Sequence, residues 1–367
     1  MKKLSDPVRK VNAQCVGLDV HKSVTVYCVL DGEGKLVEEG RFPSTRQHFE
    51  RLAQKIRANG PAHFTFEASR SSLWVHSVLR EQVDESQVHV AQAKRIQAIA
   101  NSGAKTDEND AWWLAYLTYE GRLPESYVPP ATILELRIAT RERTCAVRQR
   151  TKIINRMKAH LAQIGLVVPS SSVTTSKARL FLAENALEVD GMRGQALRGC
   201  LDELSYYEDV IQEWEQAIDA ISQGLPDVKL IEQEIPGVGQ VLAATIVAEA
   251  ADIRRFHSAK AFGCATGLTP SEHSTSGKQR NGNITREGNP NLRWALTQAA
   301  MGCLRARSGS GLAVGDWIRA KQKRMGVKAK ARAAGGRKLA EAIWRLFHYG
   351  ECFDPARPFG GKRTATT

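Results

Sequence analysis

The sequence lacks the features that mark most secreted and membrane proteins. It has seven cysteines, and because no two of them form a C-x-x-C pair, neither a disulfide framework nor a cysteine zinc site is predicted. Lys2 and Lys3 are followed by no apolar stretch, so no signal peptide is predicted. No apolar window is long enough to span a bilayer. These absences favour a cytoplasmic protein with reduced thiols and no membrane partner.

Acidic residues are in short supply. The chain has 39 Asp and Glu against 52 Lys and Arg, which leaves a formal net charge of +13 over 367 residues. Such a surplus favours a polyanionic partner, and nucleic acid is the commonest one. A basic enzyme without such a partner is the alternative that charge alone leaves open. The length itself predicts two or three domains.

The first part of the chain alternates between strand-like and helix-like segments. Residues 15–30 predict two strands that turn near His21 and Lys22, and the Asp-Gly-Glu-Gly segment at 31–34 predicts a hairpin to a third strand. The apolar spacing then predicts a helix, a strand, a helix, a strand and a helix, over residues 45–58, 63–68, 73–83, 88–91 and 106–121. This order predicts an RNase H-like α/β domain over 12–128, with an antiparallel hairpin beside a parallel core.

Prolines between residues 124 and 130 mark a boundary, and the chain beyond them is predicted to be mostly helical. Long helices are expected at 133–164 and 202–221, in a helical or coiled-coil region whose apolar faces favour self-association. The predicted regions are a helical region at 131–222, a mostly α-helical domain at 231–350 and a tail at 351–367.

Two stretches of this second part are strongly basic. Residues 141–158 contain seven Lys and Arg, and residues 319–338 contain no acidic residue. Most charge runs are solvated faces, but runs this one-sided favour contact with the phosphates of DNA or RNA.

Four acidic residues occupy positions that suggest a function for their carboxylates. Asp19 and Glu67 each lie in an otherwise apolar strand, where the ionised form is costly unless a cation or a partner compensates it. Asp107 and Asp110 are three residues apart at the start of a predicted helix and therefore share a face. Together the four could hold two Mg²⁺ or Mn²⁺ ions, which prefer oxygen ligands and can clamp both oxygens of a phosphodiester exchange.

Each acid also has a purely structural explanation. Asp107 and Asp110 would serve equally to cap their helix and to offset its dipole. Asp19 could flank a turn, and Glu67 could form a buried salt bridge. The four acids taken together, in this order, favour a metal site over four separate structural roles.

Two C-terminal segments have features that suit phosphate contact. The Pro-Gly-Val-Gly segment at 236–239 precedes an apolar helix and presents free backbone N–H groups; it resembles half of a helix-hairpin-helix motif, and an ordinary helix start explains it equally well. Residues 267–289 predict a polar, glycine-rich, basic loop before a helix that begins near Pro290, with hydroxyl groups that could simply form turns and caps. The candidate nucleic-acid-binding residues are Gly237, Gly239, Lys278, Arg280, Arg286 and Arg293.

Three N-terminal motifs resemble those of a known family. Gly-Leu-Asp-Val-His-Lys at 17–22, Phe-Glu-Ala at 66–68 and Lys-Thr-Asp-x-x-Asp-Ala at 105–111 are similar to motifs of the DEDD transposases of bacterial insertion sequences. The resemblance runs over nearly the whole chain, and related DNA invertases share it. The N-terminal domain of both resembles the RuvC Holliday-junction resolvase. The resemblance implies a metal-dependent transposase or site-specific recombinase in the bacterial cytoplasm, associated with the nucleoid, that acts on double-stranded DNA at element ends and target.

The resemblance also covers the polar loop, and there it implies a serine that attacks DNA and forms a transient covalent link. Ser274 is preferred by its distance from Lys278 and Ile284, and Ser276, directly before Gly277, is the alternative. A serine hydroxyl needs activation, which the metal site could supply if the two domains meet, within one subunit or between subunits. The resemblance further implies a structured non-coding bridge RNA as a guide. The long helices favour a homo-oligomer, a dimer or a tetramer.

Three other functions would use part of the same residues. A RuvC-like, structure-specific endonuclease needs only the four acids and leaves the serine unexplained. An actin-like ATPase or sugar kinase also begins with a Gly-x-Asp strand, but it needs further glycine-rich phosphate loops that this sequence lacks. A non-catalytic nucleic-acid-binding protein would keep its binding after loss of all four acids.

Overall fold

The computed structural model describes residues 10–92, 95–96, 106–170, 172–275, 278–285 and 287–359. The chain divides into two compact units, Met1–Val128 and Pro129–Thr367. The finer predicted boundaries at 222–231 and 350–351 stay predictions. No helix in the described ranges is long and apolar enough to cross a membrane.

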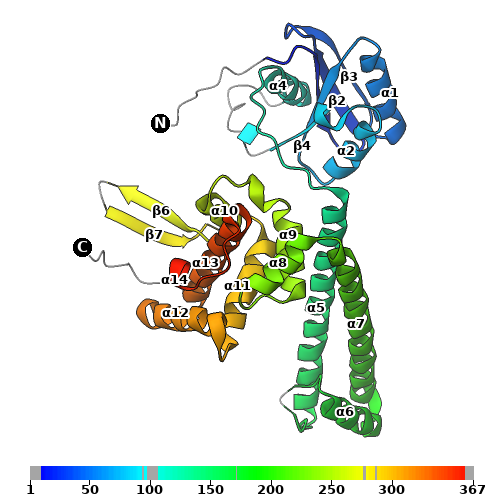
Figure 1. Ribbon diagram of the computed structural model, residues 1–367. Coiled ribbons are helices and arrows are strands. Elements are labelled where there is room, and N and C mark those ends of the chain that lie inside the picture. Colours follow the sequence, from blue (N-terminus) through cyan, green and yellow to red (C-terminus); the bar gives the residue numbers. More distant parts are fainter. Residues whose placement is uncertain are drawn as a thin grey trace, which may run out of the picture. The chain divides into compact units, whose positions relative to one another are not determined.

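The first unit is built on a mixed five-stranded sheet with the order β3-β2-β1-β4-β5 (Figure 1). Strands β1, β2 and β3 pair antiparallel, whereas β1, β4 and β5 pair parallel. The strands are β1 (Gln14–Val20), β2 (Val24–Leu30), β3 (Leu36–Pro43), β4 (Ala62–Glu67) and β5 (Val88–Ala91), and the α-helices are α1 (Arg46–Arg57), α2 (Ser72–Arg80) and α4 (Asp107–Tyr119). The predicted order of elements up to residue 121 is confirmed, and the sheet is consistent with an RNase H-like layer.

Helices cover the two faces of this sheet. Apolar side chains of α1 and α2, including Phe49 and Leu79, share one core with Leu18 of β1 and Phe66 of β4. Helix α4 packs on the other face, with Ala111 and other side chains against β2. Strands β1 and β4 give their apolar residues to the first core, whereas β2 contributes to both, with Val29 in the first and Cys28 in the second.

Gly17 allows α4 to lie directly on β1. A Cβ atom at this position would collide with the carbonyl oxygen of Ala111, so any larger residue would push the helix away from the strand. Thr65 of β4 fixes the same helix through Thr118, with 2.7 Å between the two hydroxyl oxygens. The first turn of α4 is thereby held near the ends of β1 and β4.

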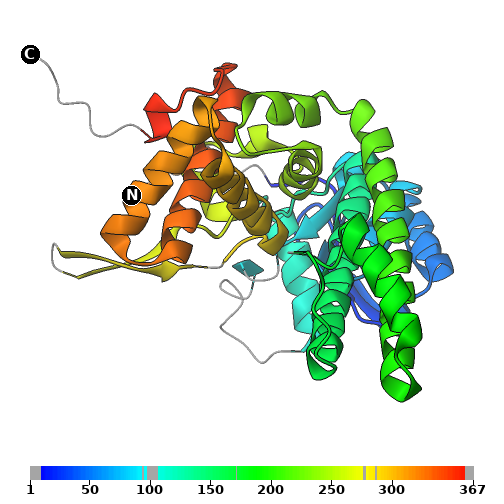
Figure 2. The same cartoon turned by 90° about the horizontal axis from the view of Figure 1, so that it is seen from below.

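The second unit begins with a long helical hairpin. Helices α5 (Ala131–Gln163) and α7 (Gly191–Gln223) run side by side, and α6 (Ser176–Glu188) packs on α7 at the far end (Figures 1 and 2). The two predicted long helices are confirmed, but the second begins at Gly191 rather than Asp202. Helix α6 was not predicted.

The rest of the second unit is a helical core from which a β-hairpin projects (Figures 1 and 2). The helices are α8 (Pro226–Glu234), α9 (Gln240–Ala250), α10 (Ala259–Ala265), α11 (Pro290–Arg305), α12 (Gly309–Met325), α13 (Lys328–Tyr349) and α14 (Ala356–Phe359). The prediction of a loop over 267–289 is wrong, because this segment contains the antiparallel strands β6 (Pro270–Thr275) and β7 (Lys278–Ile284). A projecting hairpin of polar sequence carries no alternation of apolar residues, so the usual signal for strands is missing.

Candidate functional site

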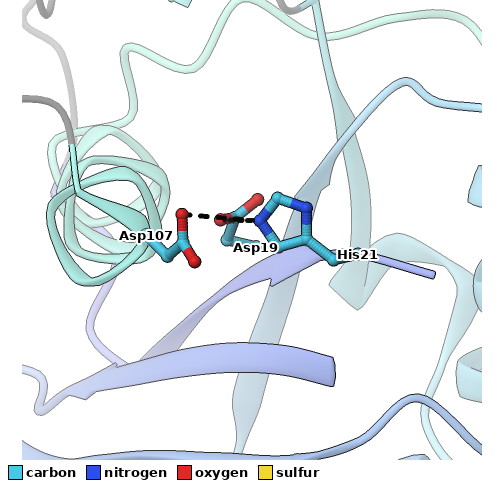
Figure 3. A group of neighbouring side chains, drawn as sticks. All are labelled: Asp19, His21 and Asp107. Atoms are coloured by element: carbon cyan, nitrogen blue, oxygen red, sulfur yellow. Dashed lines mark hydrogen bonds and ion pairs between the residues drawn. The ribbon is translucent and has the colours of Figure 1, made fainter. Parts of the chain in front are cut away.

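Asp19, His21 and Asp107 form a cluster beside the end of β1 (Figure 3). One ligand atom from each lies within 4.8 Å of the others. The Nε2 atom of His21 is 2.9 Å from Oδ2 of Asp19 and 3.5 Å from Oδ1 of Asp107. Two predicted site residues that are far apart in the sequence are therefore neighbours in the structure.

The close packing of α4 on β1 explains this meeting. Asp19 lies two residues after Gly17 and thus on the strand face that α4 covers. Asp107 is the first residue of α4, and its neighbour Thr106 caps the helix by accepting a hydrogen bond from the backbone N–H of Asn109 at 3.3 Å. The prediction that Asp107 could cap the helix is therefore wrong, whereas Asp107 and Asp110 do lie in the first turn, where acids offset the helix dipole.

Glu67 lies on β4, the strand beside β1, and Asp110 lies on α4, three residues after Asp107. Leu18 pairs with Phe66 in the parallel register, so Asp19 and Glu67 follow at adjacent positions on the α4 face of the sheet. Asp110 lies in the first turn of α4. Neither belongs to a compact ligand group with the other three among the described residues.

The charge balance at Asp19 is unfavourable. Burial raises the pKa of Asp19, and the charges of Asp107 and Asp110 raise it further, whereas His21 lowers it. The side chain is only 18% exposed, and His21 is its one ion-pair partner among the described residues. The carboxylate of Asp19 in turn raises the pKa of the His21 imidazole. A divalent cation would supply the missing positive charge, so these oxygen donors fit such an ion.

His21 was not predicted as a site residue. The signal that could have found it is its spacing, because two residues along an extended chain share a side, and His21 follows Asp19 by two. The imidazole turns its Nε2 atom toward both carboxylates (Figure 3), and neutral imidazole is itself a ligand for divalent metals. This cluster can therefore offer nitrogen as well as oxygen to a metal.

The predicted serine region lies in the second unit. Ser274 lies in β6 and pairs with Gln279 of β7. Lys278 and Arg280 are in β7, and Arg293 is in the first turn of α11. The alternative nucleophile Ser276 and the candidate Arg286 lie outside the described residues.

The Pro-Gly-Val-Gly segment forms the turn between α8 and α9. Gly237 has a φ of +75°, and a Cβ there would lie 2.8 Å from Sγ of Cys303 on α11. Gly237 and Gly239 are both exposed. The turn thus needs glycine at 237 for its conformation and its packing, whether or not it meets a phosphate.

The basic stretch at 141–158 is less available to nucleic acid than its sequence suggests. Arg141 pairs with Glu249 of α9, Arg143 with Glu215 of α7 and Arg156 with Glu203 of α7. Three of the seven cations therefore hold α5 against other helices, which leaves four of this stretch for the predicted contact with DNA or RNA.

The basic run at 319–338 is different. It lies on α12 and α13, where Lys321 has a pKa lowered by burial and by the charges of Arg324, Arg337 and Lys338. Glu341 pairs with Arg337 and Lys338, at 3.3 and 2.7 Å. The surrounding cations are only partly compensated by it, which leaves a positive surface that suits phosphate.

Known proteins match both halves of the chain. A family model described as a transposase, the IS110 type of DEDD transposase, matches residues 16–166. A second, described as the transposase IS116/IS110/IS902 family, matches residues 231–312. The first match contains all four predicted acids, and the second contains the β6–β7 hairpin.

Individual transposases are similar over much of their length. A Pseudomonas aeruginosa protein named "Probable family 20 transposase" is 28% identical over 257 residues, which cover 69% of this chain and 75% of that protein. The transposase for insertion sequence element IS1111A of Coxiella burnetii is 24% identical over 339 residues, 90% of this chain and 88% of that protein. The transposase for insertion sequence element IS1328 of Yersinia enterocolitica is 28% identical over 218 residues, 58% of this chain and 63% of that protein.

Proposed function

Because the chain belongs to the IS110/IS116/IS902 family of insertion-sequence transposases, we propose that it moves its element by cutting and rejoining DNA strands. Two groups of the protein would carry out this chemistry. The first is a divalent-metal site held by Asp19, Glu67, Asp107 and Asp110. The second is a serine nucleophile, Ser274 of β6 or, as the alternative, Ser276. The observation that carries the proposal is the meeting of Asp19 and Asp107 at the end of β1.

The four carboxylates would hold two Mg²⁺ or Mn²⁺ ions. When bound, such ions polarise the phosphate and stabilise the oxygens that attack and leave. Asp19 would gain from a cation because its carboxylate is largely buried and His21 is its one ion-pair partner among the described residues. His21 would orient Asp19 and Asp107 through its Nε2 atom, or join them as a ligand.

The serine would conserve the energy of the broken phosphodiester bond in a covalent bond between protein and DNA. Its Oγ forms a bond to phosphorus, the bond from phosphorus to the deoxyribose oxygen breaks, and that oxygen takes a proton while the serine hydroxyl loses one. Attack by the hydroxyl of another strand on the phosphoserine then rejoins DNA and regenerates serine. No external energy source is needed for this exchange.

The proposed partners are double-stranded DNA at the element ends and target, a structured non-coding guide RNA, and further copies of the chain in a dimer or tetramer. The positive surface on α12 and α13 supports a nucleic-acid partner. The long helical pair α5 and α7 supports self-association, because paired helices commonly present such interfaces.

A search for protein–DNA adducts tests this proposal. The full-length chain is incubated with Mg²⁺, labelled element-end DNA and RNA transcribed from the non-coding flank of the element, and the products are separated on a denaturing gel. The variants are Asp19→Ala, Ser274→Ala and Ser276→Ala. We expect an adduct that is lost in Asp19→Ala and in one serine variant. Cleavage without an adduct, unchanged in both serine variants, would instead indicate a RuvC-like endonuclease.

A further inference from the structure

Glu249 is a carboxylate at the centre of the second unit. It lies in the apolar helix α9, and its side chain has no exposed surface. Nε and Nη2 of Arg141 donate to its two oxygens at 2.7 and 2.8 Å. The side-chain amides of Asn289 and Asn291 donate to the same two oxygens at 2.6 and 3.0 Å. Each oxygen of Glu249 thus accepts one hydrogen bond from an arginine and one from an asparagine.

This environment keeps Glu249 ionised. Burial alone would raise its pKa, but the hydrogen bonds from Arg141 and Asn289 and the charge of Arg137 outweigh burial and hold the pKa below its usual range. Nε of Arg137 lies 3.8 Å from Oε2 of Glu249 and donates to the carbonyl oxygen of Ala248 at 2.9 Å. The pairing therefore persists at neutral pH.

Asn289 connects this carboxylate to the hairpin. It directly precedes α11, where the chain returns from β7, and its Oδ1 accepts from the N–H groups of Asn291 and Leu292 at 2.9 and 3.2 Å. Its own N–H donates to the carbonyl oxygen of Ala265 at 3.0 Å. Gly288, with a φ of +144°, leaves no room for a Cβ beside the same carbonyl group. Gly288 and Asn289, which lie between β7 and α11 and are here called the hairpin base, are therefore held against Ala265.

Arg141 connects the same carboxylate to α5. This helix is the first of the second unit and follows directly on the boundary with the first unit at Val128. Glu249 thus joins three segments that are distant in sequence, namely α5, α9 and the entry to α11. A buried ion pair is weak evidence for stability, because apolar residues of similar volume often stabilise as well, but it does fix geometry.

We propose that Glu249 is a positioning residue that holds the base of the β6–β7 hairpin in register with α5. The proposal rests on the proposed function, in which a serine of this hairpin attacks DNA. A shift of the hairpin base moves the serine away from the phosphate, and a misplacement of about 1 Å can cost about 100-fold in rate. Glu249 acts through the hairpin and does not touch the DNA.

The main test compares Glu249→Gln with Glu215→Gln in the full-length chain. Glu215 also pairs with an arginine of α5, Arg143 at 2.7 Å, but within the described part of the chain none of its hydrogen bonds reaches the hairpin base. For Glu249→Gln we expect an unchanged Kd for labelled element-end DNA, a rate of adduct formation lower by about 100-fold, and faster hydrogen–deuterium exchange over residues 285–292. Glu215→Gln should match the wild type in all three.

A double variant separates positioning from general damage. Glu249→Gln combined with Asn289→Asp lets the glutamine amide donate to the new carboxylate, which can still accept from the start of α11. We expect it to recover at least about a tenth of the wild-type rate. A purely destabilising effect of Glu249→Gln would show no such recovery and would depend on temperature near the melting point.

Wild-type exchange and adduct rates in Glu249→Gln would overturn the proposal. If that variant does not fold, Arg141→Lys takes its place, because the side chain of Arg141 is half-exposed and tolerates change more readily. The lysine keeps the positive charge but cannot form the bidentate hydrogen bond to Glu249. Wild-type values in Arg141→Lys would then overturn it. Absence of any adduct with the wild type would refute the serine chemistry alone, because hydrogen exchange at the hairpin base still reports on Glu249.

Discussion

Asp19 and Glu249 are both carboxylates withdrawn from water, and they differ in how their charge is compensated. Burial raises the pKa of Asp19, and its one described ion-pair partner is the imidazole of His21. Glu249 is more deeply buried, which would raise its pKa, yet the guanidinium groups of Arg141 and Arg137 and the amide of Asn289 lower it. The first carboxylate lacks a cation, whereas the second has its cations built into the fold. A buried carboxylate without a compensating charge indicates a binding site for a cation, whereas a compensated one indicates a structural role.

The largest expected effect is on activity at Asp19. Asp19→Asn removes a proposed metal ligand, and since even the residues that support ligands are typically worth about 10–100-fold, we expect a loss of at least about 100-fold in strand cleavage. Single-turnover cleavage of labelled element-end DNA measures it. The fold should survive, because the variant removes an unfavourable buried charge. A variant with wild-type cleavage would show that Asp19 is not part of the metal site.

Glu249 differs from Asp19 because its replacement is expected to lower stability as well as the rate of adduct formation. Glu249→Ala leaves Arg141 and two amides without their partner, and breaking a buried pair costs about 3–5 kcal/mol. Urea unfolding followed by circular dichroism measures the change. The double variant Glu249→Leu with Arg141→Met removes both charges and should lie closer to the wild type. If it is less stable than Glu249→Ala, the two charges do not act as a pair.

Lowering the pH should change the contributions of Glu249 and Asp19 to folding stability in opposite directions. The pKa of Glu249 is lowered below its ordinary value of 4.5, so its contribution to stability is complete above that pH and is lost as pH falls through its folded pKa. The pKa of Asp19 is raised above 3.8, so in the absence of metal its ionisation costs stability as pH rises. The difference in unfolding free energy between wild type and Glu249→Gln should therefore stay constant above pH 4.5 and narrow as the pH falls below it.

In the same experiment without metal, Asp19→Asn should become more stable than the wild type as the pH rises, and Mg²⁺ should remove that advantage. Melting curves at each pH, with and without Mg²⁺, give both comparisons. If melting temperature changes with pH in the same way in Asp19→Asn and Glu249→Gln, the two carboxylates do not differ in how their charge is compensated.

The smallest effect is expected at Glu108, an acid beside the cluster that is not part of it. Its carboxylate is about half exposed and pairs with Arg41 at 3.4 Å on the surface. Such pairs contribute about 0–1 kcal/mol, so Glu108→Gln should leave both melting temperature and cleavage close to wild type. A large loss of cleavage in this variant would extend the site beyond the four predicted acids.

The sequence by itself determined the elements of the first unit and predicted four acids, of which the structure brings Asp19 and Asp107 together. Apolar periodicity and turn residues are local signals, and they suffice to order strands and helices up to residue 121. The lone acids in apolar strands were likewise visible, because burial of charge is costly wherever the strand lies. The same signal, a single glutamate in the apolar segment 241–250, was present for Glu249 and was not used.

Tertiary structure alone decided which charges meet. The place of Asp107 beside Asp19 depends on the contact of Gly17 with Ala111, and the sequence does not show which helix rests on which strand. Arg141, Arg143 and Arg156 pair with acids of α7 and α9, so three of the seven cations in an apparent nucleic-acid surface serve helix packing instead. The strands β6 and β7 pair through their backbones, which leave no apolar pattern in the side chains. Local patterns specify elements, whereas partners across the chain arise only when those elements pack.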